Sequence, residues 1–267
     1  MERHFYFDGQ ILSGSDPVTL PISSALLYGK GVFTTVAIHN GQPLLWEKHW
    51  SRLERSADRL GLDLSEHSEK STMKELFGLI SSDQVIRGRA RLTFFDLRSS
   101  VLWPVETELK TAFAITTGEA KPESEHFSLT FSPHLINSLS PLAGIKSCNY
   151  LEHVMVLEEA KKRGSDEAIR LNERGVVTSG CMANIFWLKD GELFTASLQT
   201  GCLPGTTREY VLENVDCKEV EVEIEEVQAA DSIFLTSAGL GIVEVDEFDG
   251  KRLERSEHPI KGLWPPA

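Results

Sequence analysis

Pairs of Asp-Gly or Asn-Gly recur between short apolar runs, and they restrict the fold more than any other feature of the chain. Asp8-Gly9 divides residues 4–12, and Asn40-Gly41 follows the β-branched run of residues 31–39. Asp190-Gly191 separates two further apolar runs in the second half of the chain. A pair of this kind between strand-like runs is typical of a β-hairpin. The sequence therefore predicts several antiparallel strand pairs whose members are adjacent along the chain.

Amphipathic helices are expected between these hairpins. The apolar residues of segment 46–60 recur at helical spacing. Similar patterns predict helices over 70–81 and 149–164, with Asn149 placed to cap the latter. A further helix is expected after the segment Pro204-Gly205-Thr206-Thr207. Hairpins mixed with helices favour an α+β fold.

The chain is expected to form two domains. Residues 118–126, GEAKPESEH, are charged and contain Gly and Pro, a composition typical of a linker. The predicted domains are therefore a smaller one over 1–117 and a larger one over 127–267. A length of 267 residues is sufficient for two domains of modest size.

Charge and composition exclude several classes of partner. The net charge is −13, from 40 acidic and 27 basic residues, which argues against binding to nucleic acid or to an anionic membrane. The first ten residues are charged, and no stretch is long and apolar enough to span a bilayer. A chain of this size needs no disulfide framework, so we expect reduced cysteines and a cytoplasmic protein. The four cysteines form no CxxC pair and the eight histidines are scattered, so no metal site is expected.

Three familiar signatures are missing from the sequence. It contains no GxxxxGK[ST], no GxGxxG and no GxSxG. Their absence argues against P-loop, dinucleotide-binding and nucleophile-elbow sites.

Lys146 is the first residue with potential chemistry. It lies in AGIKSCNY, among small and apolar neighbours and just before a predicted helix. A lysine in a loop is most often solvated. A desolvated lysine, however, has a lowered pKa and can form a Schiff base with an aldehyde.

Three further features could bind a phosphate. Thr206 and Thr207 stand at a predicted helix start, where free backbone N–H groups attract anions. Residues 236–241, TSAGLG, form a second turn of small residues, and Arg52 lies on the predicted helix of 46–60. Each feature also has an ordinary reading, as a helix cap, a tight turn and a surface arginine. Together with Lys146 they suit a small-molecule cofactor that carries an aldehyde and a phosphate, namely pyridoxal 5′-phosphate.

The motifs that carry these residues resemble the fold-type IV class of pyridoxal-phosphate enzymes, the class IV aminotransferase-like family. The resemblance runs from YGKGVFTTVAIHNGQPLLWEKHWSRL through AGIKSCNYLEHV and DEAIRLNERGVVTSGCMANIFW to LPGTTREYV and FLTSAGLGIVEV. It implies a small N-terminal α/β domain, a larger C-terminal domain with a β-barrel-like core, and a homodimer. Several segments are most similar to the 4-amino-4-deoxychorismate lyases of the class.

The resemblance also implies roles for individual residues. Lys146 would hold the cofactor covalently and move the proton, and Arg52 would bind the cofactor phosphate. Thr34 and Thr35 would face the substrate. The remaining residues implied at the cofactor are Asn149, Ser179, Thr206, Thr207 and Ala238.

Ser179 is where the chain departs from the family pattern. The strand that reads VTSG here normally carries a glutamate at this position, which pairs with the pyridine nitrogen of the cofactor and keeps it protonated. A serine hydroxyl is neutral and can donate or accept a hydrogen bond. It would leave the ring nitrogen mostly unprotonated and the ring a weaker acceptor of electrons.

The leading hypothesis from the sequence is a lyase that releases pyruvate from 4-amino-4-deoxychorismate and forms p-aminobenzoate for folate synthesis. Formation of the aromatic ring would supply a driving force that transamination lacks. The first alternative is an aminotransferase for D- or branched-chain amino acids, with Arg87, Arg89 and Arg91 available to bind a carboxylate. The second is a relative that binds the cofactor or a partner and catalyses little, because of Ser179.

Overall fold

The computed structural model describes residues 3–18, 20–98, 110–120 and 126–264. These residues form two compact units, one from residues 1–121 and 145–149 and the other from 122–144 and 150–267. Residues 121–125, in the middle of the expected linker, lie outside the described residues. The sequence prediction placed all of 127–267 in one part, whereas the segment around Lys146 groups with the first unit.

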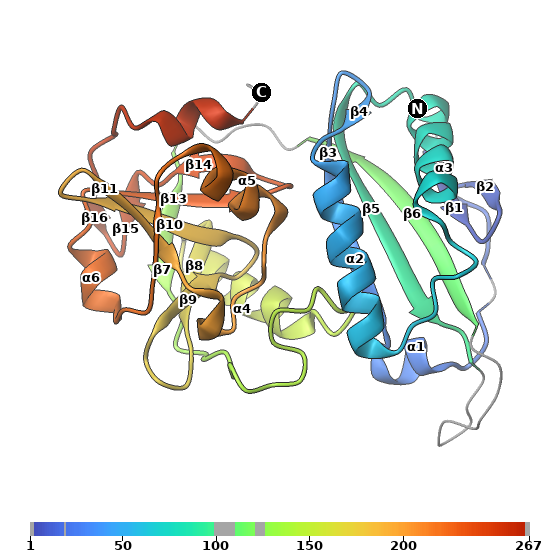
Figure 1. Cartoon of the computed structure of the whole chain (residues 1–267), viewed down its shortest axis with the longest axis horizontal. Helices are drawn as coiled ribbons and strands as arrows, with labels where there is room; N and C mark the ends of the chain where they lie inside the picture. The colour runs from blue at the N-terminus through green and yellow to red at the C-terminus, as the bar shows by residue number, and fades with distance from the viewer. Residues whose placement is uncertain (1–2, 19, 99–109, 121–125, 265–267) are drawn as a thin grey trace. The chain divides into compact units, whose positions relative to one another are not determined.

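The first unit is built on a six-stranded sheet with the order β2-β1-β6-β5-β3-β4 (Figure 1). Its pairs are antiparallel throughout. The strands are β1 (His4–Phe7), β2 (Gln10–Ser13), β3 (Gly31–His39), β4 (Gln42–Pro43), β5 (Arg87–Asp96) and β6 (Thr111–Glu119).

Two helices cover one face of this sheet. The helices α2 (Trp46–Leu60) and α3 (Glu69–Ser82) share a hydrophobic core with the inward residues of β3, β5 and β6. Side chains alternate along a strand, so Val32, Val36 and Ile38 of β3 face these helices, whereas Phe33 and Thr35 face the opposite side. A short helix, α1 (Ser24–Tyr28), was not predicted from the sequence.

The segment that carries Lys146 extends the first unit by pairing with the start of β3. The Phe33 N–H donates to the Lys146 carbonyl at 2.9 Å, and the Cys148 N–H donates to the Gly31 carbonyl at 2.8 Å. These backbone bonds fix the lysine relative to the sheet. Because of these bonds, residues 145–149 belong to the first unit, although the residues before and after them in the sequence belong to the second unit.

The second unit contains two five-stranded sheets that share one hydrophobic core. One sheet has the order β12-β11-β10-β13-β14 and the other β16-β15-β7-β8-β9. The strands are β7 (Ser128–Phe131), β8 (Glu167–Leu171), β9 (Val177–Gly180), β10 (Asn184–Lys189), β11 (Glu192–Ala196), β12 (Lys218–Val220), β13 (Ser232–Ser237), β14 (Gly241–Glu244), β15 (Glu247–Phe248) and β16 (Lys251–Arg252).

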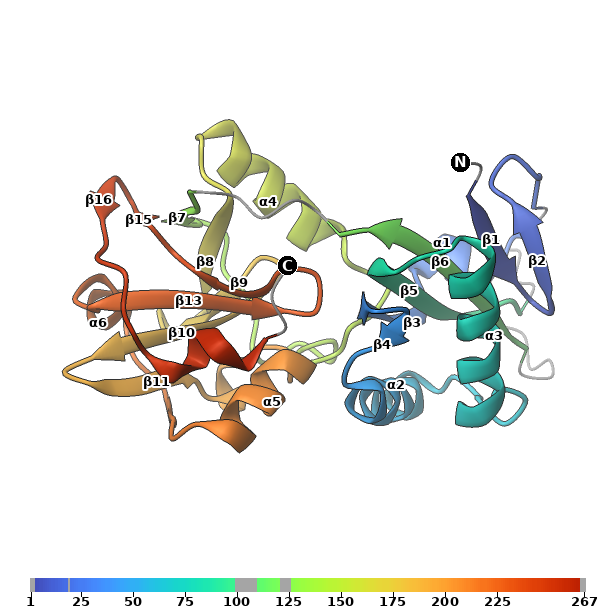
Figure 2. The same ribbon diagram turned by 90° about the horizontal axis from the view of Figure 1, so that it is seen from above.

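Helices flank these sheets, and Figure 2 shows α4 (Leu151–Lys162) and α5 (Thr206–Asn214) on opposite sides of the strands. The α4 helix packs on β8 through Val156 and Ala160. The α5 helix and the 3₁₀ helix η2 (Pro259–Leu263) pack against β10 and β13. The remaining short elements are η1 (Leu198–Thr200) and α6 (Ile224–Gln228).

The hairpins and the four long helices predicted from the sequence are confirmed, and the fold class is α+β as expected. Asn40 and Gly41 both have positive φ, 50° and 70°, as a two-residue hairpin turn requires. The predicted cap of α4 is wrong: its N-cap is Tyr150, which makes no side-chain cap bond. Asn149 instead donates through Nδ2 to the Gly29 carbonyl at 3.1 Å. A barrel-like closure of the second unit stays a prediction.

Candidate functional site

Lys146 lies among cationic and aromatic groups of the first unit, on the segment that pairs with β3. Its Nζ is 4.6 Å from the centre of the Phe33 ring, and the Arg91 guanidinium is 3.5 Å from the same centre. Desolvation comes first among the causes that lower the pKa of Lys146 well below its usual range, followed by the positive charges of Arg52 and Arg91. A lowered pKa increases the neutral fraction of the amine, which is the nucleophilic form.

Arg52 is fixed on the other side of β3 by a buried hydrogen-bond chain. It leaves α2 with 5% exposure and donates through Nη2 to Thr34 Oγ1 at 2.8 Å. The same oxygen is 2.6 Å from His49 Nδ1, also on α2. Burial, and then the charges of Arg52 and Lys146, lower the pKa of His49 well below its usual range. A neutral imidazole can therefore accept the Thr34 proton and hold that hydroxyl toward Arg52.

Thr34 and Thr35 have different surroundings because adjacent residues of a strand face opposite sides. Thr34 is fully buried against α2, where it contacts Arg52 and His49. Thr35 is partly exposed on the other face, opposite Arg91 of β5. We refer to Lys146, Arg52, Thr34, His49 and Arg91 as the lysine cluster.

In the second unit, Thr206 and Thr207 form the start of α5, as predicted. The N-cap is Gly205, and no side chain caps the helix there. Thr207 is 1% exposed, and its Oγ1 has no hydrogen-bond partner within the described residues. A Cβ on Gly205 would lie 2.0 Å from Asn184 Oδ1, so a larger residue here would displace the Asn184 side chain, which donates to the Leu203 carbonyl. Buried hydroxyls are nearly always bonded, so the orphan oxygen at a helix N-terminus indicates a place for an anion.

Ser179 lies on β9, 7% exposed, and its hydroxyl donates to the neighbouring Gly180 carbonyl at 2.8 Å. Its cross-strand partner is Arg170 of β8. Residues opposite each other in an antiparallel pair project from the same face. An arginine and a serine therefore occupy this face, and neither carries a carboxylate.

The small residues after Ser179 are explained by a buried carboxylate. Glu167 accepts hydrogen bonds from the N–H groups of Cys181 at 2.8 Å and Met182 at 2.9 Å. A Cβ on Gly180 would lie 3.4 Å from this side chain and from the Ala183 carbonyl. Burial raises the pKa of Glu167 despite these bonds. The close approach that the small residues permit is that of Glu167.

The two remaining predicted residues lie at turns. Ala238 follows β13 in the tight connection to β14, where the Leu240 N–H donates to Ser237 Oγ at 3.1 Å. Asn149 is exposed and joins the lysine segment to the end of α1.

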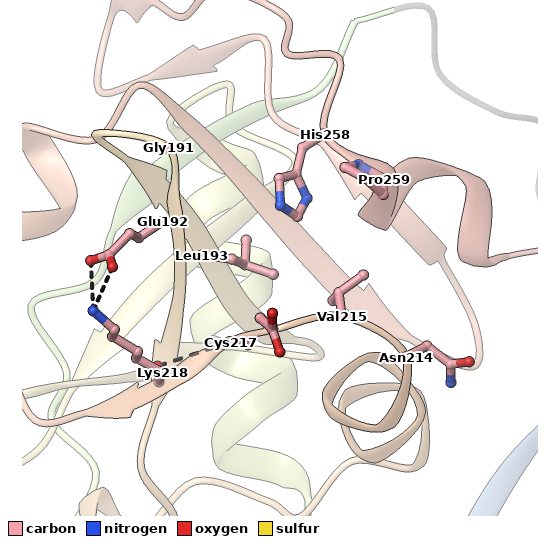
Figure 3. A pocket seen from close by; sticks show the side chains of 10 residues that line it. Gly191, Glu192, Leu193, Asn214, Val215, Cys217, Lys218, His258 and Pro259 are labelled. Atoms are coloured by element: carbon pink, nitrogen blue, oxygen red, sulfur yellow. Dashed lines mark hydrogen bonds and ion pairs between the residues drawn. The ribbon is translucent and has the colours of Figure 1, made fainter.

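An open pocket of about 560 Å³ lies elsewhere in the second unit (Figure 3). It is lined by the β10–β11 turn, the C-terminal end of α5 and the start of η2. Its edge carries an ion pair between Lys218 and Glu192, with nitrogen and oxygen 2.6 Å apart. Thr206 and Thr207 are at the opposite end of α5 from this pocket, and none of the predicted site residues lines it.

Metal-binding clusters and membrane-spanning helices are both absent from the described part of the chain. No group of three or more His, Cys, Asp and Glu side chains is arranged to hold a metal ion there. Among the same residues, every helix is too short or too polar for a bilayer span.

Sequence reasoning missed His49 and Arg170. His49 lies three residues before Arg52, a spacing that places both on one helix face. Arg170 is one of two charged residues, with Glu167, in the otherwise apolar strand EAIRL, which is uncommon for a buried strand. Only the register of β8 and β9 shows that it lies opposite Ser179.

Comparison with known proteins gives consistent matches over most of the chain. The family model for class IV amino-transferases matches residues 31–248. An aminodeoxychorismate lyase of Bacillus subtilis (strain 168) is 29% identical over 247 residues, which cover 89% of this chain and 84% of the lyase. A D-alanine aminotransferase of Bacillus licheniformis is 27% identical over 260 residues, covering 92% and 89%.

The same fold is found in a solved structure. The branched-chain amino acid aminotransferase of Escherichia coli superposes with a TM-score of 0.89 at 23% identity. The superposition covers 98% of this chain and 92% of that enzyme. At this level of identity the likeness concerns the fold.

Proposed function

The chain belongs to the class IV aminotransferase family, and we propose that it is a pyridoxal-phosphate-dependent 4-amino-4-deoxychorismate lyase. The observation that favours a lyase is that Ser179 and Arg170 occupy one face of the β8–β9 pair. Neither residue has a carboxylate that could keep the cofactor ring nitrogen protonated. Loss of pyruvate makes the substrate ring aromatic, so this reaction tolerates a weaker electron acceptor than transamination does. The similarity to the Bacillus subtilis lyase supports the same choice.

The residues present fit the proposed cofactor. The unpartnered Thr207 hydroxyl and the uncapped start of α5 suit a phosphate. The family resemblance assigns Arg52, which donates to Thr34 Oγ1, to the cofactor phosphate as well. When bound, pyridoxal phosphate supplies an aldehyde for an amine and a ring that accepts electrons from a deprotonated carbon. We further assign Ala238, Asn149 and Ser179 to the cofactor surroundings and Thr35 to the substrate side, as the family resemblance implies.

Lys146 would do the acid–base work. Its lowered pKa raises the fraction of neutral amine, the form able to take the proton from the amine-bearing carbon of the substrate. The bond between the neighbouring ring carbon and the enolpyruvyl oxygen then breaks, and that group leaves as pyruvate. The atoms balance as one aminodeoxychorismate giving one p-aminobenzoate and one pyruvate. Thr34 and His49 act indirectly, because they position Arg52.

The test is to incubate the purified full-length protein with pyridoxal phosphate and aminodeoxychorismate and to measure pyruvate and p-aminobenzoate. We expect both products in equal amounts, with none above background from Lys146→Ala. Borohydride reduction of the loaded protein should attach the cofactor to Lys146, as found by peptide mass. A wild-type protein that forms no more product than Lys146→Ala would refute the lyase.

An aminotransferase for D- or branched-chain amino acids is the second candidate, and Arg91 favours it. Its charge acts on Lys146, and it lies opposite Thr35 on the partly exposed face of the sheet. An arginine in this place could bind the carboxylate of an amino acid. Oxo-acid formation from a panel of D- and L-amino acids would separate this activity from the lyase.

The family resemblance also carries the proposals that the protein is a homodimer and that its product supplies folate synthesis, and the sequence carries the proposal that it is cytoplasmic. A weakly catalytic relative stays the third reading. A protein that gains no visible absorption on adding pyridoxal phosphate would favour it over both enzymes.

A further inference from the structure

Arg170 is a buried cation whose hydrogen bonds are incomplete. Its side chain is fully buried on β8, and Nη2 donates to the Leu135 carbonyl at 3.0 Å and to the Glu152 carboxylate. Nε donates to the His134 carbonyl at 3.3 Å. Nη1 is buried and has no partner within the residues that the structure describes. A buried guanidinium with a free N–H donor is costly unless an acceptor arrives with a ligand.

Ser179 is the cross-strand neighbour of Arg170, and the two side chains share one face of the sheet. The Ser179 hydroxyl proton is already directed to the Gly180 carbonyl, so its oxygen can only accept a further bond. The unsatisfied donor on this face is therefore Arg170 Nη1.

Glu152 makes this arrangement stable. Its carboxylate pairs with Arg170 from the start of α4, and 67% of its side chain remains exposed. The guanidinium is thereby neutralised and held by three groups, which leaves its orientation little freedom. An acceptor that is itself neutral, such as a pyridine nitrogen with its lone pair, suits such a donor better than a second carboxylate, because the charge is already balanced.

We propose that Arg170, opposite Ser179, donates a hydrogen bond from Nη1 to the pyridine nitrogen of bound pyridoxal phosphate and keeps that nitrogen unprotonated. The inference rests on the proposed cofactor and concerns residues that the family resemblance does not assign. A cation beside a basic nitrogen disfavours its protonation. The family glutamate has the opposite effect, so the exchange of glutamate for serine is accompanied here by an arginine across the strand pair.

The consequence is a restricted choice of reaction. A neutral ring accepts electrons less well than a protonated one. Reactions with their own driving force, such as an elimination that forms an aromatic ring, remain accessible. Transamination becomes slow, which gives a physical reason for a lyase to use this pair.

The experiment loads the full-length protein with pyridoxal phosphate that carries an isotope label at the ring nitrogen. Nitrogen NMR then reports whether that atom is protonated. We expect an unprotonated nitrogen in the wild type and a protonated one in the double variant Arg170→Val with Ser179→Glu, which restores the family pattern. A protonated nitrogen in the wild type, or the same signal in both proteins, overturns the proposal.

Cofactor affinity provides a second measurement that does not depend on activity. Arg170→Leu should raise the dissociation constant of pyridoxal phosphate about tenfold, the effect of losing one hydrogen bond from a charged donor. Arg174→Leu, which removes an arginine paired with Glu221 on the connection between β8 and β9, is the matched control and should leave it unchanged. If Arg170→Leu does not fold, Arg170→Lys keeps the charge and should retain an unprotonated nitrogen; a protonated nitrogen there also contradicts the proposal.

The outcomes separate this inference from the proposed function. A wild-type protein that takes up no cofactor refutes both. Uptake with a protonated ring nitrogen refutes the role of Arg170 alone. A rise only in the KM for substrate in Arg170→Leu, with unchanged cofactor affinity, would assign Nη1 to a substrate carboxylate and also overturn the proposal.

Discussion

The variant Thr207→Val tests whether the Thr207 hydroxyl has a structural role or binds a ligand. Thr207 is 1% exposed, and its Oγ1 has no hydrogen-bond partner within the described residues. Valine has nearly the same shape and lacks only the polar atom. If the hydroxyl binds the cofactor phosphate, its removal should lower the affinity for pyridoxal phosphate. It should not lower the free energy of unfolding of the cofactor-free protein.

The magnitude follows from the bond that would form. A hydrogen bond to a charged group contributes about 1.5–3 kcal/mol. At about 1.4 kcal/mol per tenfold change, the dissociation constant of pyridoxal phosphate should rise about 10- to 150-fold. Without cofactor, loss of an unsatisfied buried hydroxyl should leave the free energy of unfolding unchanged or raise it by at most about 1–3 kcal/mol.

Cofactor affinity is measured by absorbance titration, and stability by denaturant unfolding of the cofactor-free protein. Thr207→Ser keeps the hydroxyl and is the matched variant. Pyridoxal, which lacks the phosphate, is the matched ligand and should bind wild type and Thr207→Val equally. The reasoning is refuted if Thr207→Val loses more than about 1 kcal/mol of stability without cofactor while its affinity for pyridoxal phosphate is unchanged.

Three further changes test the surroundings of the site. The pKa of His49 in the folded protein lies below its unfolded value of 6.5, so the unfolded state binds more protons below that pH. The free energy of unfolding should therefore fall as the pH drops below 6.5, by up to about 1.4 kcal/mol per pH unit. His49→Asn should flatten that slope in unfolding curves. Glu167→Gln replaces one of two oxygens that accept backbone N–H groups, and should lower the free energy of unfolding by about 1–3 kcal/mol. Gly205→Ala places a Cβ 2.0 Å from Asn184 Oδ1, so it should lower the free energy of unfolding by about 1–3 kcal/mol and weaken cofactor binding. Gly262→Ala has open space around its Cβ and should change neither quantity.

Much of the fold could be predicted because its signals are local. The turn at Asn40-Gly41 needs positive φ at both residues, and this requirement is visible in the residue types. The helix over Trp46–Leu60 follows from apolar residues at helical spacing. Short helices such as Ser24–Tyr28 have too few residues for a periodic signal and were missed.

The cap of α4 shows how a local rule can fail. Asn149 is a preferred capping residue, and its position before the helix favoured that role. Pairing of the lysine segment with β3 instead holds Asn149 beside Gly29, more than a hundred residues away in the chain. A contact between distant segments therefore overrode a preference that acts over three residues.

The sequence by itself determined the residue types of the site, because Lys146, Arg52, Thr207 and Ser179 each lie in a recognisable local motif. Tertiary structure decided what surrounds them. The lowered pKa of Lys146 depends first on its burial and then on the charges of Arg52 and Arg91, which come from a helix and a strand far apart in the chain. Register between β8 and β9 decided that Arg170 faces the same side as Ser179. Charge, burial and orphaned donors depend on distances between segments, and such distances exist only once the chain has folded.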